Sequence, residues 1–266
     1  MDLPTTVLGR TGLRVTRLGI GGGYCKSADG YRAALDCGAT YVDTAHNYRD
    51  GEDEKTIGQG IKGRRDGLVL ASKSQVRDAA GARADLETSL RSLGVDYLDI
   101  WQLHYVNTPA DREQVLGPGG AYEAALRARD EGLVRFIGVT GHDWDQVGAN
   151  LAGGQFDTVL LWYNCAMPEP ELRVFPVAAQ HDTGVVLMQT TRNDRLYSPT
   201  GYPAEADFYR YVFGTPEVDV ALMGLRDVPR FQRVARDLSE RDSLCPEERG
   251  VLAMYGARMR AEGKLS

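Results

Sequence analysis

Short apolar runs recur along the chain, and amphipathic segments separate them. Each run is a few residues long, is rich in β-branched or aromatic residues, and is bounded by glycine or charge, which is typical of buried strands. We count eight such runs in the sequence. They cover residues 16–20, 40–43, 68–72, 97–103, 135–140, 156–162, 184–189 and 218–224.

The segments between these runs have helical periodicity. Two examples are residues 81–94, with Leu86, Leu90 and Leu93 on one face, and residues 120–132, with Tyr122, Ala125 and Leu126 facing inward. Strands that alternate with helices are parallel, because each helix carries the chain back across the sheet. Eight such units predict an α/β fold, a closed (β/α)8 barrel, and an open doubly wound sheet is the alternative.

Two segments lie outside the eight units. In residues 3–15, two short runs flank Gly9 to Gly12, which predicts a hairpin that covers the barrel floor. Residues 245–263 predict a final helix. No linker, low-complexity tract or strong internal repeat divides the chain, so we expect one barrel domain over residues 1–266.

Composition narrows the class of partner. With 42% hydrophobic residues among 266, the chain can bury a sizeable core. Its net charge of −6 argues against a nucleic-acid binder and favours a small-molecule partner. The chain has neither an apolar run long enough to span a membrane nor a signal-peptide pattern, so we expect a cytoplasmic protein. Oligomeric state is not indicated.

Cysteine and histidine spacing gives no sign of a metal site. The four cysteines form no CxxC pair, which fits neither a zinc site nor a disulfide framework, so we expect reduced thiols. The four histidines show no HExxH spacing. We therefore expect no bound metal.

Polar side chains follow three consecutive predicted strands. Asp43 ends the second strand, Lys73 follows the third, His104 follows the fourth, and Tyr48 lies in the loop after the second. The carboxyl ends of barrel strands form the working face, so we expect these four side chains to converge. Taken singly, each has an ordinary alternative, because an aspartate after a strand can cap a helix and a histidine can be a hydrogen-bonded core residue.

Together the four groups fit proton donation to a carbonyl oxygen. A phenol donates reluctantly at neutral pH, and an adjacent ammonium lowers its pKa. Lys73 would supply that charge to Tyr48, and Asp43 would pair with the buried ammonium and orient it. His104 would orient the substrate oxygen or help to relay its proton.

The sequence also resembles the aldo-keto reductases along nearly its whole length. The segments that resemble this family's blocks, in order and spacing, are "LGRTGLRVTRLGIGGG", "YVDTAHNYRDGEDEKTIGQGI", "VLASKS", "SLRSLGVDYLDIWQLHYV" and "ALRARDEGLVRFIGVTGH". The resemblance implies a (β/α)8 barrel that reduces an aldehyde or ketone to an alcohol with NADPH. It places the family's catalytic Asp, Tyr, Lys and His at Asp43, Tyr48, Lys73 and His104.

The resemblance further implies contacts with NADP(H). Thr140 and Gly141 would meet the nicotinamide amide, with Met188 where a ring usually stacks on the nicotinamide. His142 would lie beside them or be a hydrogen-bonded loop histidine. After the eighth strand, the implied contacts are Gly224 for close backbone approach, Arg226 and Arg230 for the ribose 2′-phosphate, and Gln232 near the adenine.

Three positions depart from the family's pattern. Leu160 replaces a glutamine that usually grips the nicotinamide amide, Met188 replaces an aromatic ring, and Val234 replaces a polar residue near the adenine. Two alternatives to a reductase therefore stay open: a non-redox lyase, dehydratase or epimerase, or a regulatory subunit that binds NADPH. Arg226 and Arg230 could also be solvated charges on a helix face.

Overall fold

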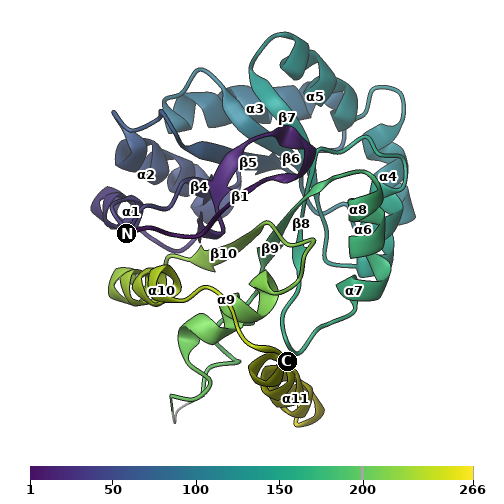
Figure 1. Ribbon diagram of the computed structural model, residues 1–266. Coiled ribbons are helices and arrows are strands. Elements are labelled where there is room, and N and C mark those ends of the chain that lie inside the picture. The colour runs from purple at the N-terminus through teal and green to yellow at the C-terminus, as the bar shows by residue number, and fades with distance from the viewer. Residues whose placement is uncertain (199–200, 266) are drawn as a thin grey trace.

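The chain folds into a closed barrel of parallel strands ringed by helices, as a computed structural model shows for residues 1–198 and 201–265 (Figure 1). The barrel strands are β3 (Leu18–Gly21), β4 (Tyr41–Asp43), β5 (Val69–Ser74), β6 (Leu98–Leu103), β7 (Val134–Thr140), β8 (Thr158–Trp162), β9 (Gly184–Met188) and β10 (Val220–Gly224). Strand β10 pairs with β3 in parallel, which closes the ring. The predicted (β/α)8 barrel is confirmed, and the open sheet is excluded.

Each predicted apolar run overlaps one barrel strand. The main difference is in β5, which continues to Ser74, so that Lys73 lies inside the strand and not after it. The extension has a clear cause, because Lys73 and Ser74 pair in register with Gln102 and Leu103 of β6. The sheet hydrogen bonds of the Lys73 backbone therefore determine the position from which its side chain extends.

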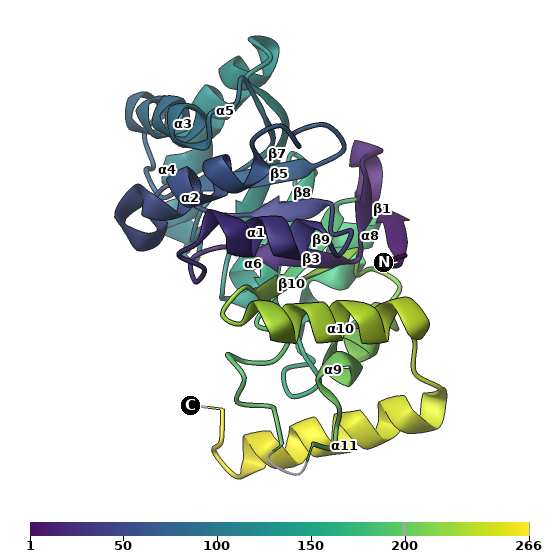
Figure 2. The same cartoon turned by 90° about the vertical axis from the view of Figure 1, so that its left-hand side faces the viewer.

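Helices cover the outside of the barrel, with α9 lying between α10 and α11 (Figure 2). They are α1 (Ala28–Leu35), α2 (Glu52–Ile61), α3 (Ala79–Leu93), α4 (Pro109–Leu116), α5 (Ala121–Asp130), α6 (Trp144–Leu151), α7 (Pro170–Arg173), α8 (Phe175–Gln180), α9 (Glu205–Phe213), α10 (Val228–Glu240) and α11 (Pro246–Ala261). The last is the predicted terminal helix. In the described part of the chain, no helix has the length and hydropathy needed to cross a bilayer.

Helix α5 packs on the barrel mainly through a face of alanines, so the predicted inward face is confirmed for Ala125 and only in part for Tyr122 and Leu126. The fully buried positions are Ala121, Ala124, Ala125 and Ala128. Tyr122 and Leu126 are only partly buried. Tyr122 donates a hydrogen bond from its hydroxyl to the Gln155 carbonyl at 3.1 Å, so its polar end stays near the surface. Small side chains on the inner face allow the helix to approach the strands closely.

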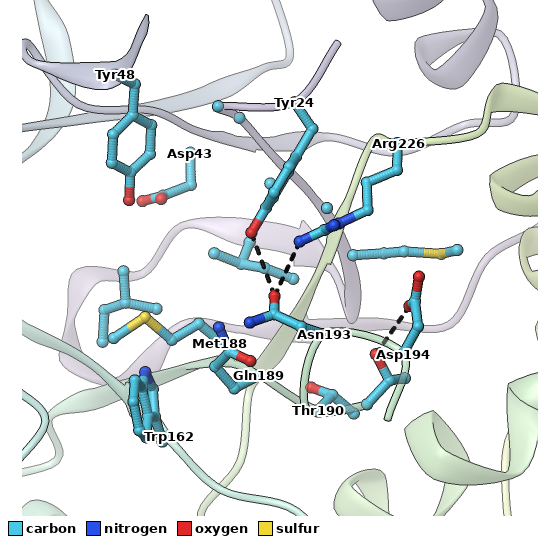
Figure 3. Close-up of a pocket in the computed structure, with 18 of the residues that line it drawn as sticks. Tyr24, Asp43, Tyr48, Trp162, Met188, Gln189, Thr190, Asn193, Asp194 and Arg226 are labelled. Carbon is cyan, nitrogen blue, oxygen red and sulfur yellow. Dashed lines mark hydrogen bonds between the residues drawn. The ribbon is translucent and has the colours of Figure 1, made fainter. Parts of the chain in front are cut away.

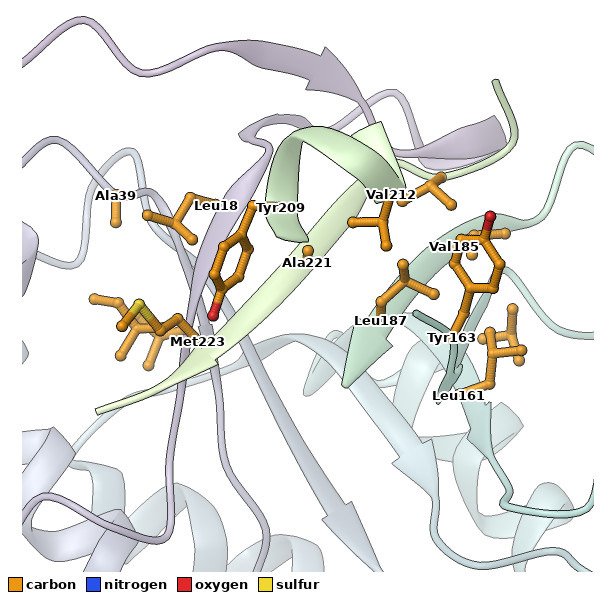
Figure 4. Packing of buried hydrophobic residues seen from close by; sticks show 14 of the residues in the cluster. Leu18, Ala39, Leu161, Tyr163, Val185, Leu187, Tyr209, Val212, Ala221 and Met223 are labelled. Carbon is orange, nitrogen blue, oxygen red and sulfur yellow. The ribbon is translucent and has the colours of Figure 1, made fainter. Parts of the chain in front are cut away.

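Side chains alternate along the strands between the barrel interior and the helix layer. The interior cluster includes Val186 of β9 with Val220 and Leu222 of β10. Their neighbours Val185, Leu187 and Ala221 belong to the outer core, where Tyr209 and Val212 of α9 pack against them (Figure 4). This alternation follows from the period of two in a strand and gives the protein two separate cores.

The predicted hairpin closes the barrel floor. Strands β1 (Thr5–Val7) and β2 (Arg14–Thr16) pair antiparallel, and the short 3-10 turn η1 (Gly9–Thr11) joins them. Leu8 and Leu13 belong to the barrel's interior cluster, and the amide of Arg10 donates to the carbonyl of Asp182, just before β9. The hairpin therefore covers the amino-terminal ends of the strands and leaves the carboxyl ends free.

Gly9 is the tightest point of this floor, and we expect its replacement to destabilise the fold. Its φ is +41°, and an added Cβ would lie 2.3 Å from the backbone nitrogen of Gly184. Gly9→Ala should cost about 3 kcal/mol, from a left-handed alanine plus overpacking. Gly12→Ala is the matched control, because Gly12 also has a positive φ but an added Cβ meets no described atom within 4 Å. Urea unfolding midpoints check this prediction, and equal losses would contradict it.

Candidate active site

A pocket of about 360 Å³ opens at the carboxyl ends of the strands. Tyr48, Asp43, Met188 and Trp162 surround one end, and Tyr24 and Arg226 lie at the other (Figure 3). Its walls come from the loops after β3, β4, β6, β7, β9 and β10 and from the end of β8. Of the four predicted catalytic residues, Asp43 and Tyr48 line the pocket, while Lys73 and His104 lie directly behind them.

Lys73 and Asp43 form a buried ion pair. The Lys73 Nζ lies 2.5 Å from Asp43 Oδ1, and it also donates to the carbonyl of Thr44. The second carboxylate oxygen accepts a hydrogen bond from Gln102 Nε2 at 2.8 Å. Burial lowers the pKa of Lys73, but Asp43 and Tyr48 outweigh it, so the net shift is upward and the amine stays protonated. Gln102 was not predicted from the sequence as a member of this group.

Tyr48 begins the short 3-10 turn η2 (Tyr48–Gly51), and its ring lies beside the ammonium. The Lys73 Nζ is 4.8 Å from the ring centroid. The pKa of Tyr48 is nevertheless raised, because burial of the phenol exceeds the opposing effect of Lys73, and Asp43 adds to the rise. The predicted downward shift of this pKa is therefore wrong for the protein alone, and the phenol is held neutral.

His104 follows β6 directly and completes the group. Its ring lies edge-on to Tyr48, with centroids 6.0 Å apart. Burial, followed by the nearby charge of Lys73, lowers the pKa of His104 to about 2, so the imidazole is neutral. Its Nδ1 is buried without a hydrogen-bond partner among the described residues. The structure thus brings all four predicted side chains together.

Two buried carboxylates of α2 support the site, and no sequence pattern singled them out. Asp53 accepts hydrogen bonds from the amide of Gly23 and from the hydroxyls of Thr44 and Tyr31, at 2.8 to 3.0 Å. Glu54 accepts one from Ser72 on β5 at 2.5 Å. Asp53 therefore ties the loop after β3 to the loop after β4, where Tyr48 lies.

Four of the seven residues predicted to contact the cofactor line the pocket: Met188, Gly224, Arg226 and Arg230. The Arg226 guanidinium lies over the ring of Tyr24, 4.1 Å from its centroid, and donates to Asn193 Oδ1 at 3.0 Å. Arg230 is paired with Asp194 at 2.9 Å and with Glu205 at 3.2 Å. Arg226 is exposed and precedes α10, where its own two contacts hold it, and Arg230 on α10 is half-buried between two carboxylates.

The other three predicted contacts lie outside the pocket lining. Thr140 is buried, and its hydroxyl oxygen accepts from the amide of Tyr105 at 3.0 Å. An added Cβ at Gly141 would meet the Val147 side chain at 2.6 Å, so this glycine allows α6 to approach. Gln232 lies on α10 and is half-buried. Val234, expected near the adenine, is instead fully buried in the outer core.

An aromatic wall forms the side of the pocket next to His104. The rings of His104 and Tyr105, of Tyr105 and His142, and of His142 and Trp162 pack in succession, with centroids 4.3 to 4.4 Å apart. His142 lies inside this wall, and burial lowers its pKa to about 4, so it is neutral. Leu160 adds an apolar contact to the pocket. The sequence offered the separate aromatic residues but no sign that they would stack.

Comparisons with known proteins agree with this geometry. The family model "Aldo/keto reductase family" matches residues 24–198, more than half of the chain. The chain is 31% identical over 205 residues to "Aldo-keto reductase YhdN" of Bacillus subtilis, and the match covers 68% of this chain and 60% of that protein. It is 25% identical over 227 residues to the "NADH-specific methylglyoxal reductase" of Escherichia coli, covering 72% of this chain and 66% of that one.

A solved structure extends the comparison to the fold. An aldo/keto reductase from Klebsiella pneumoniae, in complex with NADP and acetate, superposes with a TM-score of 0.76 at 26% identity, covering 96% of each chain. The chain thus spans nearly all of that structure, but only about 60% of the length of YhdN.

We expect the Lys73–Asp43 pair to behave as one unit in stability measurements. Lys73→Met or Asp43→Asn alone leaves an unpaired buried charge, which should cost about 3–5 kcal/mol. The double variant removes both charges and should cost less than the sum by at least about 1 kcal/mol. Chemical denaturation of the four proteins at pH 7 measures this coupling, and additive losses would show that the two groups do not interact.

Proposed function

Because the chain belongs to the aldo-keto reductase family, we propose that it reduces the carbonyl group of a small aldehyde or ketone to an alcohol with NADPH. One observation carries the proposal: a neutral phenol, Tyr48, borders the pocket with a buried ammonium at its back. That arrangement is suited to giving a proton to an oxygen that gains negative charge. The curated relatives include methylglyoxal reductases, which supports a small carbonyl substrate.

Tyr48 is proposed as the proton donor. Its raised pKa keeps it protonated at neutral pH, so the proton is available when substrate binds. As the proton leaves, the charge that develops on the phenol oxygen is stabilised by Lys73. Asp43 keeps the buried lysine charged and, through Gln102, fixed in direction. The raised pKa keeps the proton on Tyr48 before the reaction. The Lys73 ammonium then stabilises the phenolate that forms when the proton leaves.

His104 is proposed to orient the substrate oxygen. A neutral imidazole donates a hydrogen bond from one ring nitrogen and accepts one at the other. Its low pKa means that it adds no second positive charge beside Lys73. Proton transfer is thus assigned to Tyr48, and positioning to His104.

The described residues fit a nicotinamide dinucleotide. The pocket extends from Tyr48 to Arg230, as a long two-part ligand would need. Two buried polar atoms in its lining, Gln189 Oε1 and Thr190 Oγ1, have no hydrogen-bond partner among the described residues. Arg226 has a hydrogen bond to Asn193 but no ion pair within the described chain. When bound, the cofactor supplies the hydride. Met188 and Gly224 would contact it, Arg226 and Arg230 would bind its phosphates, and the relative solved with NADP supports this assignment.

The proposed role of Tyr48 makes a direct prediction. Tyr48→Phe should lower kcat for a panel of aldehydes by about a hundredfold to ten-thousandfold, because general acid catalysis is lost. Affinity for NADPH, followed by nicotinamide fluorescence, should be nearly unchanged. Tyr122→Phe, which removes a hydroxyl from the outer helix α5, is the matched control and should keep full activity. Retained turnover in the Tyr48 variant would refute its role, and absence of saturable NADPH binding would favour a non-redox acid–base enzyme.

Arg230 and its carboxylates should set the preference between NADPH and NADH. Arg230→Ala should weaken NADPH by about tenfold and NADH much less, since a charge-assisted bond to the 2′-phosphate is lost. Glu205→Gln removes one competing carboxylate, so it should tighten NADPH relative to NADH. Fluorescence titration with both cofactors measures each effect. Equal changes for the two cofactors would contradict the phosphate assignment.

A further inference from the structure

The loop after β9 holds an arginine whose charge has no carboxylate partner among the described residues. The Arg192 guanidinium lies over the Trp162 ring, 4.7 Å from its centroid. Within residues 1–198 and 201–265 its side chain makes no ion pair or hydrogen bond, and its Nε is buried without an acceptor. Burial and the neighbouring Arg195 lower its pKa. A partly buried cation without a counter-charge is costly, and an anionic ligand would remove that cost.

The other arginines around the pocket already have partners. Arg226 donates to Asn193, Arg230 pairs with Asp194 and Glu205, and Arg49 lies 3.7 Å from Asp53. Asp194 is only two residues from Arg192 in the sequence, but Arg230 holds it. Asp194, the single acidic residue of this loop, therefore does not neutralise Arg192.

Arg192 lies at the end of the aromatic wall that begins at His104. The wall continues through Tyr105 and His142 to Trp162, and the charge of Arg192 also lowers the pKa of His142. Trp162 lies across the pocket from Arg226, which is proposed to bind the cofactor (Figure 3). Arg192 is not itself among the residues that line the pocket, but its ring partner Trp162 and its chain neighbours Thr191 and Asn193 are. The cation therefore lies at the edge of the pocket, against the Trp162 end of the wall.

The backbone that carries Arg192 is held in an unusual conformation. Gln189, Arg192, Asn193 and Asp194 all have positive φ values, between +52° and +68°. The side-chain amide of Asn164 donates from Nδ2 to the Gln189 carbonyl at 2.9 Å, which fixes the start of this segment. Such conformations cost free energy and cluster at ligand-binding segments. The loop therefore holds these side chains in place at a cost in backbone conformational free energy.

We propose that Arg192 binds a carboxylate of the substrate, so that the enzyme acts on aldehydes or ketones bearing a carboxylate remote from the carbonyl group. The inference rests on the reductase function proposed above. The planar guanidinium would donate two hydrogen bonds to the carboxylate. The aromatic wall would pack against the body of the substrate, and Tyr48 would receive its carbonyl oxygen. Arg192 is thus a specificity-determining residue and takes no part in proton transfer.

A matched pair of aldehydes tests this inference: 4-formylbenzoate and its uncharged methyl ester, each reduced with NADPH. In Arg192→Met, kcat/KM for 4-formylbenzoate should fall by about tenfold to a hundredfold, while the ester should change by less than about twofold. Arg192→Lys keeps the charge and should retain most of the preference. Arg195→Met, the same substitution at an exposed arginine three residues along the loop, should change neither substrate.

The remaining outcomes are each decisive. Equal losses for both aldehydes, with weaker NADPH binding, would assign Arg192 to the cofactor phosphates and overturn the proposal. No loss for either, or no preference for the acid in the unmodified protein, would also overturn it. If the unmodified protein reduces the ester, the reductase function stands even when this inference fails. If it reduces neither aldehyde, this inference is overturned, and the panel of aldehydes used for the Tyr48 variant decides the reductase function separately.

Discussion

The buried ion pair between Lys73 and Asp43 is the interaction on which the candidate site depends. Removing two charges from water costs several kcal/mol for each ion, and only close, fully hydrogen-bonded geometry compensates for it. Here the two atoms are 2.5 Å apart, and Gln102 and the Thr44 carbonyl take up further hydrogen-bonding capacity. The ion pair is therefore stable only because the strands hold the two charged groups in this close, hydrogen-bonded geometry.

That placement comes from the register of three neighbouring strands. Asp43 ends β4, Lys73 lies in β5, and Gln102 is the register partner of Lys73 in β6. A slip of one residue would turn each side chain to the opposite face of the sheet. The hairpin at the floor and the interior cluster hold the ring closed at the other end, so the carboxyl ends can carry polar groups.

The charges around the pocket are divided between its parts. At the centre, Tyr48 and His104 are neutral because burial disfavours their charged forms, and Lys73 is balanced by Asp43. Two guanidinium groups lie farther out, Arg226 over Tyr24 in the pocket wall and Arg192 over Trp162 at the pocket's edge. A substrate and a cofactor that each carry negative charge could thus meet at a centre without net charge. Under the proposed assignments, this division would keep the negative charges of both ligands away from the reacting atoms.

The sequence by itself determined the barrel and the four central side chains, because both depend on local periodicity. Apolar runs of strand length located each strand, and a polar residue at or near the end of a run in a parallel barrel must lie near the same mouth, as Asp43 and His104 do. Only the tertiary structure decided the pKa of Tyr48, the carboxylates on Arg230, the burial of Val234 and the stacking of His142 with Trp162. These properties depend on how deeply a group is buried and on partners distant in the chain, and no local pattern encodes either.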